Sequence, residues 1–160
     1  STLPLYTADR ELLKQILKRN KISEERQKNI LEYAEARKLR VIKILETKIL
    51  EDEIPIVTKD EFAAHPQVLE LSGIFCETDI TYSYEEYMSH LAMTEEFAAS
   101  HSNYKLLKAS TPAFRNLQIL IHEDQWVMVS KSKAPAIHFV IRHPKLRKAI
   151  ENFIPPVIDK

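Results

Sequence analysis

The chain contains a single glycine, Gly73, among its 160 residues. Phosphate-binding loops of the P-loop and Rossmann types need several glycines to bring the backbone close to a phosphate, so both nucleotide-binding motifs are excluded. No proline or glycine interrupts the chain between residues 23 and 54. That uninterrupted stretch predicts one long helix, because proline and glycine are the residues that most often end helices.

Two helices are predicted at the amino end. Thr7 is expected to cap the first, which ends near Arg19, and Ser23 is expected to cap the second, over residues 24–50. The apolar stripe of the second helix comprises Ile30, Leu31, Ala34, Val41, Ile42, Leu45 and Ile49. Lys38 interrupts this stripe, which leaves two roles open: pairing with a second copy as a coiled coil, and packing on the protein's own sheet.

Pro55 and a change in the sign of the charge mark a boundary. Residues 1–50 hold 12 Lys/Arg and 7 Asp/Glu, residues 51–103 hold 1 and 12, and residues 104–160 hold 10 and 4. We therefore expect a helical linker or dimerisation segment over residues 1–52 and an α/β domain over residues 53–160.

Two capping boxes predict helices in the acidic middle of the chain. Thr58 with Glu61, and Ser83 with Glu86, both match the pattern in which a hydroxyl residue is followed three positions later by glutamate. Strands are predicted before each box, over residues 54–57 and 74–82, because these segments are apolar, β-branched and aromatic.

An antiparallel run of strands closed by a helix is predicted for the last third of the chain. The strand-like segments are residues 104–109, 114–122, 126–130 and 136–142, and residues 123–125 form a tight connection. Pro144 fits the first turn of the closing helix, and Pro155-Pro156 is expected to end it. Its expected core stripe is Leu146, Ala149, Ile150 and Phe153. The fold class is therefore α+β: amino-terminal helices followed by a mainly antiparallel β-sheet flanked by helices.

Composition indicates a cytoplasmic protein. The chain has no apolar run long enough to span a membrane and no secretory signal, and its single cysteine, Cys76, cannot form an internal disulfide. Because the chain starts at Ser1 without a methionine, we expect either a fragment of a longer protein or a processed start.

Residues 116–130 resemble the central hairpin of phospholipase D-like domains, in which a strand carrying His-x-Lys-x4-Asp is followed by an apolar strand ending in Gly-Ser-x-Asn. Residues 136–153 are similar to the next strand and closing helix of that family. At the family's catalytic positions this chain has Asn116, Gln118 and Glu123. An amide side chain cannot act as the covalent nucleophile, so the resemblance implies a phospholipase D-like fold without its chemistry, without catalytic residues and without a cofactor.

The chain also resembles the carboxy-terminal region of bacterial helix-turn-helix regulators of the Xre type. The residues that carry this resemblance are Glu70-Leu71-Ser72-Gly73 and the segment from Ala134 to Pro144. The resemblance implies a regulatory module that senses a ligand and forms a homodimer, with DNA bound only through a domain before Ser1.

A polar or anionic small ligand is the expected partner of this module, because amides donate and accept hydrogen bonds while basic side chains supply positive charge. The residues expected to bind it are Arg115, Asn116, Gln118, Ser130, Lys131, Lys133 and His138. His122 lies in the same predicted sheet as His138, so the two histidines are expected to approach each other, but no third ligand for a metal is evident.

Two other functions remain open. One is a phosphodiesterase or nuclease-like hydrolase that uses His122, Glu123, Asp124 and His138. The other is a structural protein-interaction domain without a ligand.

Overall fold

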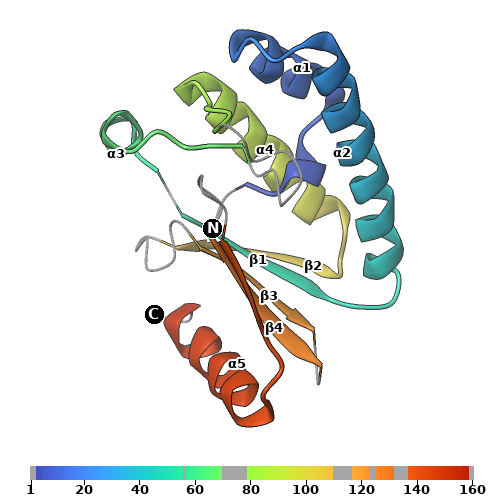
Figure 1. The fold of residues 1–160 in the computed structure, drawn as a ribbon, viewed down its shortest axis with the longest axis vertical. Helices are drawn as coiled ribbons and strands as arrows, with labels where there is room; N and C mark the ends of the chain where they lie inside the picture. Colours follow the sequence, from blue (N-terminus) through green and yellow to red (C-terminus); the bar gives the residue numbers. More distant parts are fainter. Residues whose placement is uncertain are drawn as a thin grey trace.

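The structure of the protein, a computed structural model, describes residues 3–55, 57–69, 79–109, 117–122, 125–131 and 137–158. Its elements in chain order are η1 (Leu5–Thr7), α1 (Arg10–Arg19), α2 (Glu24–Leu45), β1 (Leu50–Pro55), α3 (Lys59–Ala64), α4 (Tyr84–Ser100), β2 (Tyr104–Ala109), β3 (Leu117–His122), β4 (Trp126–Lys131), β5 (Ile137–Ile141) and α5 (Pro144–Ile158). The strands lie between α1, α2 and α4 on one side and α5 on the other (Figure 1). The predicted α+β class is confirmed in these general terms.

The first helix is capped by Asp9, and the prediction of Thr7 as its cap is wrong. The Asp9 carboxylate accepts a hydrogen bond from the backbone N–H of Leu12 at 2.7 Å, which satisfies one of the free donors of the first turn. Thr7 instead belongs to η1 and is buried, with its hydroxyl donating to the carbonyl of Pro4.

The second helix begins after Ser23, as predicted, but ends at Leu45 and not at residue 50. The side chain of Asn103 donates to the carbonyl of Leu45 at 2.7 Å, and the backbone N–H of Leu50 donates to the carbonyl of Asn103 at 2.9 Å. Pairing with β2 therefore converts the expected last helical turn into the start of β1. Ile49, an expected stripe residue, is exposed for this reason.

Both predicted capping boxes are confirmed. The Thr58 and Ser83 hydroxyls each accept from the backbone N–H of the glutamate three residues later, and each glutamate side chain accepts from the backbone N–H of its hydroxyl residue. The strand predicted over residues 74–82 falls only in part on described residues. Residues 70–78 lie outside the described residues, and Thr81 forms an isolated antiparallel bridge with Val68.

The described strands form two sheets. β1 and β2 pair in parallel, and β3, β4 and β5 form an antiparallel sheet in that order. The predicted hairpin and its neighbouring strand are confirmed, but residues 104–109 do not belong to the antiparallel run. The connection from β1 to β2 contains α3 and α4, and helical crossovers of this kind join parallel strands.

One core joins the amino-terminal helices to the middle of the chain. Its buried members lie on both sides of residue 52, from Leu3 to Tyr87, and include Ile16 and Leu17 of α1 and Ile30 of α2. The apolar stripe of α2 is thus mostly buried within the chain itself. A smaller cluster contains Tyr6, Val41, Leu45, Phe97 and Tyr104.

The closing helix begins at Pro144, as predicted, and packs against β4. It continues to Ile158, so the expected stop at Pro155-Pro156 is wrong; the fixed φ of proline is itself compatible with a helix. Leu146 and Ala149 are exposed, which contradicts the expected core stripe. Among the described helices, none is long and apolar enough to cross a membrane.

Candidate functional site

Two of the predicted ligand-binding residues are in direct contact on the antiparallel sheet. Ser130 on β4 pairs with His138 on β5, and the Ser130 hydroxyl lies 2.8 Å from Nδ1 of His138. Ser130 is buried, whereas the imidazole is exposed. Because Nδ1 is engaged with the hydroxyl, the ring is held in one orientation and its Nε2 edge is available to another group.

The backbone register brings a third predicted residue to the same level. Gln118 on β3 pairs with Ser130, so Gln118, Ser130 and His138 form one row across three adjacent strands. Lys131 follows at the end of β4, opposite Ile137. The remaining predicted ligand residues, Arg115, Asn116 and Lys133, lie outside the described residues.

The predicted approach of His122 to His138 is wrong. His122 pairs with Trp126 at one end of the hairpin, and their rings are 5.5 Å apart, whereas His138 pairs with Ser130 at the other end. The two levels, Trp126 and Ser130, are four positions apart on β4, which is roughly 13 Å at the usual rise of a strand. Glu123 and Asp124 lie outside the described residues, and no cluster of possible metal ligands occurs in the part of the chain that the structure describes.

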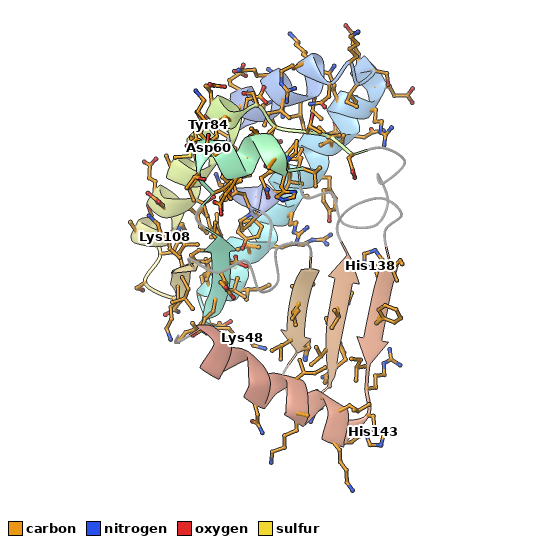
Figure 2. The ribbon with its side chains drawn as sticks, turned by 90° about the vertical axis from the view of Figure 1, so that its left-hand side faces the viewer. Lys48, Asp60, Tyr84, Lys108, His138 and His143 are labelled. Carbon is orange, nitrogen blue, oxygen red and sulfur yellow. The ribbon has the colours of Figure 1, made fainter. Side chains whose placement is uncertain are left out.

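His138 lies at the end of β5 far from α5, and His143 lies at the junction of β5 and α5 (Figure 2). The two histidines therefore mark opposite ends of one strand. A separate hollow of about 240 Å³ opens between α1 and α2. It is lined by Ala8, Asp9, Arg10, Leu13, Leu31, Ala34, Glu35 and Lys38, so it includes none of the predicted ligand residues.

A buried histidine that the sequence interpretation missed links α4 to the amino-terminal segment. Nε2 of His90 lies 3.0 Å from the Pro4 carbonyl and 3.0 Å from the Thr7 hydroxyl, and Nδ1 lies 2.7 Å from the Tyr82 hydroxyl. Because a carbonyl only accepts, Nε2 carries the hydrogen and Nδ1 accepts from Tyr82. Burial lowers the pKa of His90 to about 4 despite its bond to Pro4, so the ring is neutral.

A second cluster is formed by the half-buried Asp52 of β1 and the buried Tyr6 and Tyr104. The Asp52 carboxylate accepts hydrogen bonds from the hydroxyls of Tyr104 and Tyr6, the latter at 2.9 Å, and the Arg37 guanidinium lies over the Tyr6 ring at 5.9 Å. Burial raises the pKa of Asp52, while both hydrogen bonds and Arg37 act in the opposite direction. Burial also raises the pKa of Tyr6, so this phenol remains a donor.

The sequence contains a signal for the first of these clusters. His90 and Thr94 are four residues apart, so in a helix they lie on one face together with the apolar Tyr87 and Leu91, and a polar pair on a buried face needs partners. No comparable signal marks Asp52, because its two tyrosine partners are distant in the sequence. Both clusters join segments of the fold, whereas the Ser130–His138 pair includes an exposed side chain, that of His138.

Comparison of the chain with protein-family models, with curated proteins and with solved structures found no match.

Proposed function

We propose that the chain is the ligand-sensing and dimerisation module of a transcriptional regulator, built on a phospholipase D-like fold and without catalytic activity. The observation that carries this proposal is the Ser130–His138 hydrogen bond, in register with Gln118. It supports a site at the carboxy-terminal end of β4, where the resemblance locates the former active site.

The chemistry of the row favours a polar or anionic ligand. An imidazole held through Nδ1 offers Nε2 as a donor or acceptor, and hydrogen bonds from a protonated imidazole to an anion are stronger than neutral ones. Arg115, Lys131 and Lys133 are near this row in the sequence and would add positive charge.

The order of elements supports the fold assignment. The β3–β4 hairpin, the antiparallel β5 and the helix that starts at Pro144 follow one another in the order expected for a phospholipase D-like domain. Asn116 and Gln118 replace the nucleophile and the phosphate-binding lysine. Their amides neither attack phosphorus nor shuttle a proton near neutral pH, so the same positions are assigned to binding.

A thermal-shift experiment tests the ligand site. Inorganic phosphate, sulfate, sugar phosphates and mononucleotides would be added to the 160-residue chain, and a ligand that binds only the folded state raises the melting temperature as its concentration increases. We expect at least one of these probes to raise it, and we expect the rise to disappear in His138→Ala and Gln118→Ala.

His143→Ala is the matched control, because His143 is an exposed histidine at the opposite end of β5 (Figure 2). This variant should keep the full response. A response that survives in His138→Ala, or the absence of any response across the probes, would contradict the ligand site.

A further inference from the structure

The edge strand β5 is the most exposed apolar segment of the antiparallel sheet. Phe139 at its centre is 62% exposed and the neighbouring Val140 is 53% exposed, although adjacent residues of a strand point to opposite faces. Ile137 is exposed as well. Among the described strands β5 pairs only with β4, and it lies at the outer side of the sheet, away from β1 (Figure 2).

β5 also lacks the features by which proteins usually protect a sheet edge. Lysine, other charged residues and proline discourage an edge strand from pairing with another chain. The described edge β1 carries Glu51, Asp52, Glu53 and Pro55, and β2 carries Lys105 and Lys108. The five residues of β5 are Ile-His-Phe-Val-Ile. They include no proline, no lysine and no arginine or acidic residue.

The sequence of β5 indicates what would cover it. In an antiparallel pair centred on Phe139, Phe139 faces its own copy and Ile137 faces Ile141 of the second copy, so that apolar residues meet apolar residues on this face, while His138 faces Val140 on the other. The face formed by Ile137, Phe139 and Ile141 is symmetric about Phe139, so it is complementary to itself, as an interface with a two-fold axis requires.

We propose that β5 pairs with β5 of a second copy of this chain, which extends the three-stranded sheet across a two-fold axis at Phe139. The inference rests on the dimerisation included in the proposed function and specifies its surface. A five-residue strand buries a small interface, so the dimer is expected to be weak, with a dissociation constant in the micromolar range.

The competing surface is the helix α2, for which the sequence left open a coiled coil with a second copy. Its apolar residues Ile30, Leu31 and Ala34 are buried in the core of the same chain and are not free to form a seam. Leu39 is exposed on α2 to 64%, nearly the same fraction as Phe139. It therefore provides a matched position for comparing the two surfaces.

Disulfide cross-linking between copies tests the inference in a Cys76→Ser background. Directly opposed residues of antiparallel strands have Cα atoms about 4.5 to 5.5 Å apart, within the range that a disulfide spans. We expect Phe139→Cys to form a covalent dimer at least tenfold faster than Leu39→Cys. A mixture of Ile137→Cys and Ile141→Cys should link more readily than either variant alone, because these two positions face each other across the axis.

Phe139→Lys provides a second measurement that needs no cross-link. It places two like charges opposite each other at the axis, so the dissociation constant measured by sedimentation should rise at least tenfold. Suppose that the unmodified chain dimerises, but that only Leu39→Cys forms the cross-link or that both cysteine variants cross-link at the same rate. The dimer then exists but does not form through β5. If the chain is monomeric, both the surface and the dimerisation fail.

Discussion

Arg19 at the end of α1 holds the carboxylate of Glu86 in the first turn of α4. Nε of Arg19 lies 3.0 Å from each carboxylate oxygen, and Nη2 lies 2.7 Å from Oε2. The Glu86 side chain is 2% exposed, whereas that of Arg19 is 40% exposed. The pair therefore joins two helices that are distant in the sequence, with the acid buried and the base partly in water.

Removing the base should cost more than the loss of a surface ion pair, because the buried carboxylate of Glu86 loses the cation that neutralises it and, among the described residues, keeps only the capping bond from Ser83. We expect Arg19→Met to lower the free energy of unfolding by about 1.5–3 kcal/mol, the range for hydrogen bonds to charged groups. Urea denaturation measures this loss. Arg10→Met is the control: Arg10 pairs with Glu35, both side chains are about half exposed, and the expected loss is under about 1 kcal/mol. Equal losses in the two variants would show that burial of Glu86 has no energetic consequence.

His90 should make the fold less stable in mild acid. Its pKa is lowered from 6.5 to about 4 in the folded chain, so between these values the unfolded chain binds a proton that the folded chain does not. Stability therefore rises with pH across this window, by roughly 3 kcal/mol for this group. The test compares the free energy of unfolding of the wild type and His90→Gln from pH 4 to pH 7.

The wild-type advantage over His90→Gln should shrink as the pH falls from 6.5 toward 4, and groups common to both proteins cancel in the difference. The difference between the two proteins reports the protonation of the His90 imidazole, because the glutamine amide does not titrate. A difference that stays constant over this range would mean that His90 binds its proton equally well in both states.

Asp52 should have the opposite pH dependence. Burial raises its pKa above the ordinary value of 3.8, so its stabilising contribution is complete below that value and is lost as the pH rises through the folded pKa. Asp52→Asn should therefore gain stability relative to the wild type as the pH increases above 4, measured by urea denaturation. Asp60→Asn, at an exposed site on α3, should show a smaller change (Figure 2). A relative stability of Asp52→Asn that falls with rising pH would mean that folding lowers the pKa of Asp52.

The parts of the fold that sequence predicts well are those determined by local chemistry. The capping boxes at Thr58 and Ser83, the start of α2 after Ser23 and the start of α5 at Pro144 all depend on residues within one helical turn. The hairpin of β3 and β4 is similarly local, because a short connection enforces antiparallel pairing.

The errors occur where distant segments decide the outcome. Helix α2 ends early because Asn103 and β2, far along the chain, supply the partners of Leu45 and Leu50. β2 joins a parallel sheet because a helical crossover precedes it, which a pattern of alternating residues does not encode. The exposure of Leu146 follows the same rule, since an apolar stripe predicts that a face can be buried but not that anything covers it.

The candidate site was predictable in part for the same reason. Alternation along the strands indicated that Gln118, Ser130 and His138 belong to one sheet, but their common level depends on the register between strands, which the structure supplies. The same register separates His122 from His138. A hydrolytic site that needs both histidines is therefore disfavoured by backbone geometry and not by residue type.

The proposal that this chain is a pairing and sensing module is tested most directly by its mass in solution. Sedimentation velocity at tens of micromolar should detect a species of twice the mass of the chain, with a fraction that increases with concentration, as expected for a dissociation constant in the micromolar range. A sample that remains strictly monomeric at these concentrations would contradict the central claim.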